Sequence, residues 1–161
     1  MTENAATPAG QQFADRTPLA QPVPREIIAR FHDYLPAQDA VDRLDERLSR
    51  ARYLCGDRPT EADWRLFTTL VRFDLVYYAH FKCNLARLQD FPNLWNYLLD
   101  LYQTPGFTQT TNLEHIKVHY YWSQDTVNPT RIVPLGPRLD LTAAHDRDRL
   151  GPRRITPLPG F

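Results

Sequence analysis

The stretch RPTEADWRLFTTLVRFDLVYYAHFKCN, residues 58–84, decides the fold of this chain. Its apolar residues recur every three or four positions, which is the period of a helix, and they cover most of its sides. They form two neighbouring stripes, Trp64, Phe67, Val71, Leu75 and Tyr78 in one and Leu66, Leu70, Phe73 and Tyr77 in the other. The pattern predicts a central, buried helix of about 20 residues, roughly 30 Å long, beginning near Thr60.

Thr60 and Asp63 stand at the predicted start of this helix. The first four amides of a helix have no partner within the helix. In a capping box, a threonine at the N-cap and an acidic residue three positions later each accept a hydrogen bond from the amide of the other. We therefore interpret Thr60 and Asp63 as structural capping residues rather than catalytic ones, worth about 1 kcal/mol at a solvated helix end.

Three further stretches share the helical period. They predict helices over residues 39–54, from Pro92 to a stop at residues 104–106, and from near Thr111, where Thr111 and Glu114 have capping-box spacing. Their apolar faces are Val41, Leu44, Leu48 and Ala51; Leu94, Trp95, Leu98, Leu99 and Tyr102; and Leu113, Ile116 and Tyr120. Because no stretch alternates with period two for long, the predicted fold is an all-α helical bundle.

Proline and aromatic residues divide the chain into three parts. Of the 14 prolines, 11 fall in residues 1–40 or 129–161, whereas 15 of the 19 aromatic residues fall in residues 41–128. Proline interrupts helices, and a core needs buried apolar area to offset chain entropy. We therefore predict a disordered or divergent N-terminal arm (1–38), a packed helical domain (39–128) and an extended, Pro-rich tail (129–161).

The bulk composition excludes several classes of partner. The chain has 161 residues with 19 basic and 19 acidic side chains, so it lacks the basic excess of a protein that binds nucleic acid by charge. Its apolar runs are shorter than the roughly 20 residues of a membrane span, and its first residues do not resemble a signal peptide. We predict no nucleic acid, no membrane and a cytoplasmic location. There Cys55 and Cys83 are expected as reduced thiols, although one disulfide is possible.

Several blocks of the sequence resemble a known family. YLCGDRPTEADWRLFTTLVRFD, residues 53–74, resembles the start of the C-terminal helical domain of glutathione transferases. YYAHFKCN, DFPNLWNYLLDLYQTPG, TTNLEHIKVHYYWSQDTVNPTRIVPLGP and AAHDRDRL extend the likeness to the glutathionyl-hydroquinone reductases, or xi-class glutathione transferases. The resemblance runs from about Asp39 to Leu150.

The resemblance implies a two-domain enzyme. In the family, a thioredoxin-like domain binds glutathione, the cosubstrate, and carries the catalytic cysteine in a Cys-Pro-Trp-Ala motif. Its thiolate attacks the glutathione sulfur of a glutathionyl-hydroquinone and releases hydroquinone, and a second glutathione resolves the mixed disulfide. The helical domain builds the pocket for the quinol and a homodimer interface, and its tail wraps back over the body.

This sequence contains no Cys-Pro-Trp-Ala motif and no βαβ unit. The resemblance therefore implies the C-terminal domain of such an enzyme without its catalytic half, and leaves open whether the chain is an enzyme. It could pair with itself or with a separate thioredoxin-like domain. The alternatives are a non-catalytic dimerisation or interaction module and a truncated pseudo-enzyme.

The resemblance also implies site residues. Tyr120 matches a tyrosine that lines the hydroquinone pocket of the family, where the ring would stack on the quinol and the hydroxyl would bond to its oxygen. Tyr77 is expected at the edge of that pocket and Arg72 as a further substrate-binding residue. For Tyr120 and Tyr77 the alternative is a core tyrosine. For Arg72 and Asp74 together, the alternative is structural, either a buried ion pair or a cap on a neighbouring loop.

No catalytic residue and no metal ligand is predicted in this chain. Cys83 has His80 and Lys82 as sequence neighbours, but a structural loop cysteine is favoured over a reactive thiol. Cys55 is expected as a small packing residue in a tight turn. His115 and His119 are four residues apart, and no third ligand has a suitable spacing.

Overall fold

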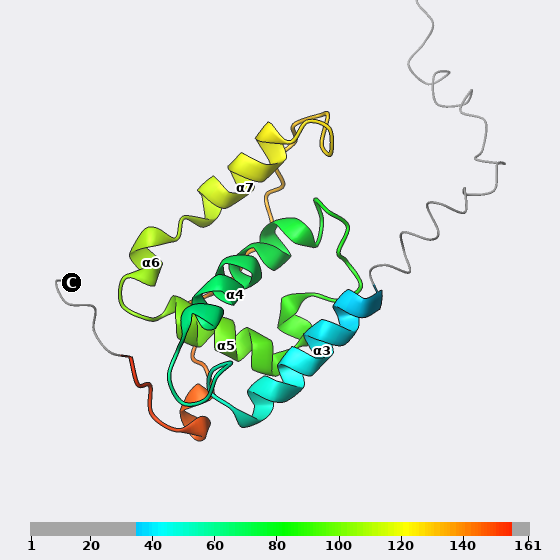
Figure 1. Cartoon of the computed structure of the whole chain (residues 1–161). Helices are drawn as coiled ribbons and strands as arrows, with labels where there is room; N and C mark the ends of the chain where they lie inside the picture. Colours follow the sequence, from blue (N-terminus) through cyan, green and yellow to red (C-terminus); the bar gives the residue numbers. More distant parts are fainter. Residues whose placement is uncertain (1–34, 156–161) are drawn as a thin grey trace, which may run out of the picture. The chain divides into compact units, whose positions relative to one another are not determined.

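The computed structural model describes residues 35–155, with side chains from residue 39 onward. Within this range every regular element is helical and no strand forms, which confirms the all-α prediction (Figure 1). The predicted arm lies outside the described residues except for residues 35–38, and so do the last six residues of the chain. The helices are α3 (Leu35–Arg50), α4 (Glu61–Arg72), α5 (Pro92–Tyr102), α6 (Phe107–Thr110) and α7 (Leu113–Ser123). Short π and 3₁₀ turns are η1 (Phe73–Tyr77), η2 (Leu88–Asp90) and η3 (Arg147–Leu150).

Helix α4 is the central element, as its sequence predicts. It packs against α5, and the η1 turn that continues it packs against α7. The main core takes apolar side chains from α3, α4 and α5, including Leu48, Phe67, Leu70, Val71, Leu94, Tyr97 and Leu98. A smaller second core joins η1 to α7 through Leu75, Val76 and Tyr121. None of the described helices is both long enough and apolar enough to cross a membrane.

The predicted long helix changes its winding at Phe73. From there η1 is a π-helical turn, in which the Tyr78 amide donates to the Phe73 carbonyl at 2.9 Å. Such turns occur mostly as single insertions within α-helices, often at functional sites. Here η1 carries Asp74 and Tyr77, which contact different parts of the molecule.

The start of α4 is a buried junction rather than a solvated cap. Asp63 is fully buried, and its Oδ2 accepts from the Thr60 amide at 2.7 Å and from the Thr60 hydroxyl at 3.0 Å. Its Oδ1 accepts from the Leu54 amide at 2.8 Å and from the Tyr97 hydroxyl at 2.7 Å. One carboxylate therefore ties the start of α4 to the preceding turn and to α5.

The start of α7 differs from the prediction by one residue. Asn112, not Thr111, is the N-cap, and its side-chain oxygen accepts from the His115 amide at 2.9 Å. The threonine and Glu114 had the spacing of a capping box, but asparagine caps helices at least as well as threonine.

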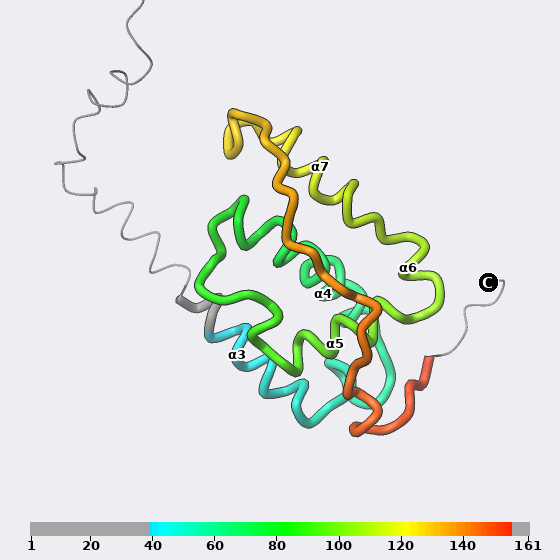
Figure 2. The backbone as a smooth tube through the Cα atoms, turned by 180° about the vertical axis from the view of Figure 1, so that it is seen from behind, coloured from blue at the N-terminus to red at the C-terminus, as the bar shows by residue number. Residues whose placement is uncertain are grey.

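The tail runs past α7, the end of α5 and the end of α3 in that order (Figure 2). Pro134 and Leu135 accept hydrogen bonds from Lys117 of α7, and Leu141 and Ala143 accept from Gln103 after α5. Fully buried Arg147 then donates to carbonyls at the end of α3, those of Leu48 and Ala51 at 2.6 Å and of Arg52 at 2.7 Å. The tail thereby completes a helix end that would otherwise leave carbonyls unpaired.

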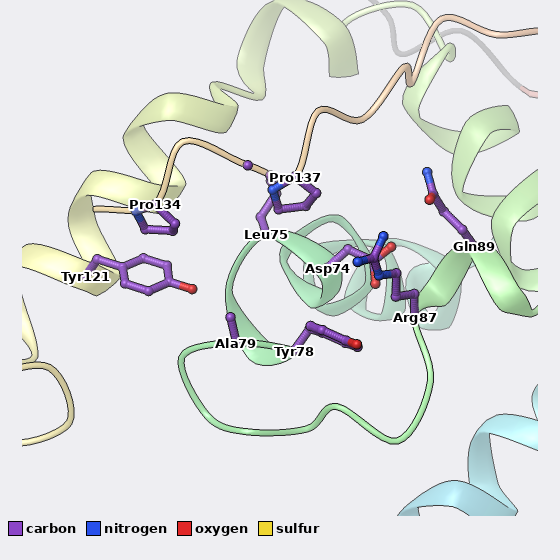
Figure 3. A pocket seen from close by; sticks show the side chains of 10 residues that line it. Asp74, Leu75, Tyr78, Ala79, Arg87, Gln89, Tyr121, Pro134 and Pro137 are labelled. Carbon is purple, nitrogen blue, oxygen red and sulfur yellow. The ribbon is translucent and has the colours of Figure 1, made fainter. Parts of the chain in front are cut away.

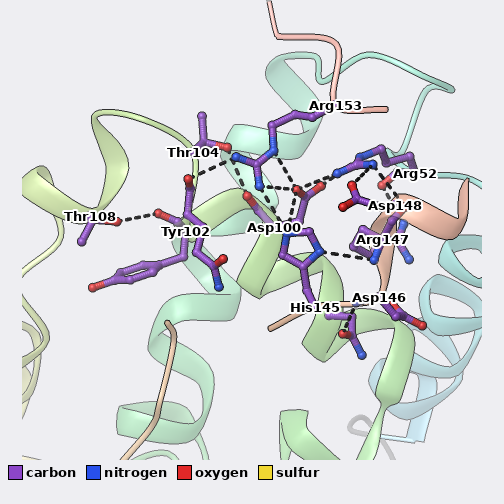
Figure 4. A network of polar contacts seen from close by, with 12 residues as sticks. Arg52, Asp100, Tyr102, Thr104, Thr108, His145, Asp146, Arg147, Asp148 and Arg153 are labelled. Carbon is purple, nitrogen blue, oxygen red and sulfur yellow. Dashed lines mark hydrogen bonds and ion pairs between the residues drawn. The ribbon is translucent and has the colours of Figure 1, made fainter. Parts of the chain in front are cut away.

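Asp100 anchors the same segment by charge (Figure 4). Its carboxylate is fully buried and lies 3.0 Å from the Arg52 guanidinium and 2.6 Å from that of Arg153. His145 Nε2 lies 3.4 Å from the same carboxylate. Because Arg153 and His145 belong to the tail, this network joins the tail to α5 and to the turn after α3.

Candidate functional site

The structure brings Tyr77 and Tyr120 together. Their ring centroids are 6.2 Å apart and their planes are 76° from parallel, so the rings meet edge to face across η1 and α7. Phe81 packs against both, with centroids at 5.5 Å from Tyr77 and 5.9 Å from Tyr120. We refer to Tyr77, His80, Phe81 and Tyr120 as the aromatic cluster.

The surroundings of Tyr77 favour its protonated form. Burial, followed by hydrogen bonding with Tyr120, raises the pKa of Tyr77 above its ordinary value. The side chains of both tyrosines are half-buried, so the pair remains partly accessible. A protonated phenol both donates and accepts, so Tyr77 can bond to a hydroxyl or a carbonyl oxygen of a ligand.

His80 is the member of the aromatic cluster that sequence reasoning missed as a site residue. It is buried, and its ring meets Phe81 at 4.9 Å and Tyr121 at 4.6 Å between centroids. His80 Nε2 lies 2.9 Å from Oε1 of Gln124, which caps the end of α7. The available signal was its position three residues after Tyr77, which places both on one side of a helical turn.

Arg72 lines a separate cavity of about 380 Å³ between α4 and the α6–α7 segment. The cavity walls include Phe67, Val71, Phe107, His115 and Ile116. Arg72 donates to the carbonyl of Thr68. The positive charge of Arg72 also lowers the pKa of Tyr77, although burial raises that pKa by more. The two predicted residues therefore interact electrostatically.

Arg72 and Asp74 form no ion pair in the described part of the chain. Asp74 Oδ1 instead accepts from the Leu88 amide at 2.7 Å. Of the two structural alternatives for these charges, the structure shows the second, because the Asp74 carboxylate caps the neighbouring loop at Leu88. Arg72 is left with a carbonyl partner.

The surroundings of Cys83 disfavour its thiolate form. Burial raises the pKa of the Cys83 thiol, whereas a nucleophilic cysteine needs a lowered pKa. Cys55 is exposed, so its predicted role as a packing residue is wrong. The tight turn places Cys55 on the outside while its neighbour Tyr53 is buried. Both thiols are unpaired. Within residues 35–155, no three or more His, Cys, Asp or Glu side chains are grouped so that they could hold a metal ion. His115 and His119 therefore belong to no such group.

Comparison with known proteins gives a consistent result. The family model described as "Glutathione S-transferase, C-terminal domain" matches residues 28–99. The glutathionyl-hydroquinone reductase YqjG of Escherichia coli is 50% identical over 110 residues, which are 68% of this chain and 34% of that protein. The glutathionyl-hydroquinone reductase PcpF of Sphingobium chlorophenolicum is 52% identical over 104 residues, 65% of this chain and 33% of that protein.

Solved structures agree in fold. The glutathione-bound structure of YqjG matches with a TM-score of 0.68 at 49% identity, covering 70% of this chain and 36% of that one. A xi-class glutathione transferase from Natrialba magadii matches with a TM-score of 0.68 at 54% identity, covering 70% and 35%. This chain spans about a third of the length of the curated relatives it matches. The helical domain of this chain is therefore similar to the C-terminal domain of glutathione S-transferases, and among them to that of the xi-class members.

Proposed function

We propose that this chain supplies the acceptor-binding domain for the glutathione-dependent reduction of glutathionyl-hydroquinones. The observation that carries the proposal is the contact between Tyr77 and Tyr120, which have 6.2 Å between ring centroids. The identity of 50% to a glutathionyl-hydroquinone reductase supplies the substrate class.

Each predicted site residue has a role in this proposal. Tyr120 and Tyr77 bind the oxygens of the quinol ring, and their ring edges and Phe81 contact its face. Arg72, which has a carbonyl as its partner, binds an anionic group of the glutathionyl substituent through its guanidinium. His80 positions Tyr120 by linking the turn after η1 to the end of α7.

The thiol chemistry is proposed to lie outside the described residues. Those residues form no strand, so they contain no thioredoxin-like domain. Glutathione enters as the cosubstrate on such a domain, in the same or in a second polypeptide. The raised pKa of Cys83 supports keeping the nucleophile elsewhere. A cytoplasmic location, where glutathione keeps thiols reduced, completes the proposal.

A binding titration tests the pocket. Purified chain is titrated with hydroquinone and with glutathionyl-hydroquinone, and the tyrosine ring signals are followed by NMR. Tyr120→Phe is expected to weaken binding about two- to tenfold, the range for one hydrogen bond. The matched control Tyr102→Phe alters a core tyrosine of α5 and should leave affinity unchanged. Equal affinities for wild type and Tyr120→Phe would remove Tyr120 from the site.

A turnover assay tests where the chemistry lies. The purified chain is incubated with glutathionyl-hydroquinone and glutathione while free hydroquinone is measured. We expect no release above the background reaction of glutathione alone. Release by the chain that disappears in Cys83→Ser would show that this cysteine is the nucleophile, against the present assignment.

A dimerisation or interaction module is the second candidate function. It is favoured by large apolar side chains that face solvent, among them Trp122 at 57% and Leu135 at 97% exposure. Val118 on α7 and Ile132 in the tail are exposed as well. Sedimentation velocity distinguishes the cases, because a clean monomer at high concentration, unchanged by added full-length reductase, would count against a module. A weak helical circular dichroism signal with a non-cooperative melt would instead indicate the truncated pseudo-enzyme.

A further inference from the structure

Two cavities of the described part of the chain differ in charge. One, of about 320 Å³, lies between η1, the segment before α5 and the tail, and it is lined by both Asp74 and Arg87, which have opposite charges (Figure 3). The other, of about 380 Å³, has Arg72 as its only described lining residue with a permanent charge, and no described aspartate or glutamate lines it. Glu114 of α7 pairs with Lys117 at 2.8 Å instead. The cavity beside Arg72 therefore favours an anion, whereas the first cavity favours neither sign.

The polar side chains of the cavity beside Arg72 have donors to spare. A guanidinium carries several N–H donors in a planar fork, and Arg72 uses one nitrogen, Nη1, for the carbonyl of Thr68. Thr111 and His115 line the same cavity, and neither side chain forms a hydrogen bond with another described residue. A carboxylate only accepts hydrogen bonds, and a guanidinium can bind one through two parallel bonds. The free donors of this cavity therefore suit a carboxylate.

Much of the remaining wall of this cavity is apolar and already packed. Phe67 and Val71 are buried, and the ring of Phe67 meets that of Phe107 edge to face at 5.2 Å between centroids. Phe107 and Ile116 are only half-buried, so a ligand can still cover part of their surface. Removal of apolar surface from water favours binding. A bare inorganic anion would leave this surface exposed, so the wall favours a ligand with an apolar body.

We propose that the cavity beside Arg72 binds a small carboxylic acid with an apolar body, whose carboxylate pairs with the Arg72 guanidinium. The apolar body lies against Phe107 and Ile116. The volume lies at the lower end of about 300–1,000 Å³ for small-molecule sites, which suits a single ring with a short acidic chain. The inference shares one residue with the proposed function, which assigns Arg72 to an anionic group of the glutathionyl substituent. To that extent it rests on the proposed function, and the acid and the substituent compete.

Ligand-observed NMR on the full chain tests the proposal with four probes. Phenylacetate carries both the ring and the carboxylate, phenylacetamide is its neutral counterpart, phenethylamine is a cation, and acetate lacks the ring. We expect phenylacetate to bind about tenfold more tightly than phenylacetamide, the value of a hydrogen bond to a charged group. It should also bind more tightly than acetate, and phenethylamine should bind no better than the amide. Equal binding of phenylacetate and phenylacetamide, or of phenylacetate and acetate, would overturn the proposal.

Variants locate the bound acid. Arg72→Gln is expected to weaken phenylacetate binding about tenfold, and Arg72→Lys, which keeps the charge but not the fork, by less. The matched control Arg65→Gln lies on the exposed side of α4, where Arg65 pairs with Glu61, and should leave the affinity unchanged. Thr68→Phe fills the cavity from an exposed lining position while Arg72 stays, and it should abolish binding while the thermal melt remains cooperative. If both Arg72→Gln and Thr68→Phe bind phenylacetate as the wild type does, the proposal is wrong.

Competition separates this proposal from the proposed function. Glutathionyl-hydroquinone that displaces phenylacetate supports both, because they then share Arg72. If it binds without displacing phenylacetate, the acid site stands and the assignment of Arg72 to the glutathionyl substituent is wrong. If glutathionyl-hydroquinone binds and phenylacetate does not, the acid site is wrong and the proposed function stands. Phenylacetate binding that is weakened by Tyr120→Phe but not by Arg72→Gln would place the acid at the aromatic cluster and overturn the proposal.

Discussion

Asp63 and Asp74 are two buried carboxylates eleven residues apart on the same helical segment, and they are held in opposite ways. At the start of α4, the two oxygens of Asp63 accept four hydrogen bonds, from Leu54, Thr60 and Tyr97. In η1, one oxygen of Asp74 accepts from Leu88, and the other is buried without a hydrogen-bond partner in the described part of the chain.

The difference separates a fully bonded buried acid from a half-bonded one. A fully bonded carboxylate has no lone pair left for a ligand, so all of its contribution goes to folding. A half-bonded one leaves part of its desolvation cost uncompensated in the folded state. Burial alone does not distinguish the two, because both side chains are nearly inaccessible.

The largest expected effect is on Asp63. Asp63→Ala leaves the Leu54 and Thr60 amides and the Tyr97 hydroxyl unpaired, each at about 1–3 kcal/mol. We expect the free energy of unfolding in urea to fall by about 3–5 kcal/mol. Asp74→Ala, the matched control, should cost less than half as much because it removes fewer hydrogen bonds. Equal losses would end the distinction drawn between the two acids.

A third buried acid, Asp100, sharpens the comparison because its partners are charged. Asp100→Asn leaves the Arg52 guanidinium, 1% exposed, with Asp148 as its remaining carboxylate. Breaking one partner of a buried pair costs about 3–5 kcal/mol, and we expect the lower end because Asp148 remains. The urea midpoint should fall accordingly. Asp148→Asn, at an exposed carboxylate, is the control and should change it little.

The pH dependence of stability should distinguish Asp74 by its sign. Because the pKa of Asp74 is raised in the folded state, its neutral form is favoured there. Its contribution to stability is full below the unfolded pKa, near 3.8, and is lost as the pH rises through the folded pKa. The free energies of unfolding of wild type and Asp74→Asn are measured from pH 3.5 upward in steps of about half a unit. We expect the free energy of unfolding of the wild type to fall relative to that of Asp74→Asn as the pH rises. Parallel curves would mean that Asp74 ionises normally.

The smallest expected effect is within the aromatic cluster. Tyr120→Phe removes the hydroxyl that helps to raise the pKa of Tyr77, so that pKa should fall toward its ordinary value. Ultraviolet difference titration of the tyrosines follows the change, with Tyr102→Phe as the control. Since burial is the larger cause, a residual elevation should remain. A pKa of Tyr77 that is unchanged in Tyr120→Phe would show that the two hydroxyls do not interact.

Sequence periodicity predicts the helices because apolar stripes report directly on the core. The stripe of Phe67 and Val71 is buried as its spacing requires. The π turn at η1 was not predicted, since its residues keep a helical apolar pattern while their hydrogen bonds shift by one position. The N-cap of α7 was misplaced for a related reason, because Thr111 and Asn112 are both good capping residues.

The candidate site is predictable only where residues are close in sequence or match a family motif. Tyr120 and Tyr77 came from the resemblance, and the structure places them in contact. Asp74 and Tyr121 line one cavity only because α7, η1 and the tail meet there, and no local pattern encodes that. The ion pairs of Asp100 with Arg52 and Arg153 span 48 and 53 residues and were equally invisible.

The hydrogen bonds from Arg147 to the end of α3 also set an order of events during synthesis. Arg147 lies 99 residues after Leu48, whereas helical domains usually fold early through local contacts. At about 5–20 residues per second, a ribosome needs roughly 5–20 s to add Arg147 after Leu48. We expect chains stalled on the ribosome before Arg147 to be cut by protease near the end of α3, and chains stalled well beyond Gly151 to resist. Completion of the domain would then wait until Arg147 has been synthesised and can reach the end of α3.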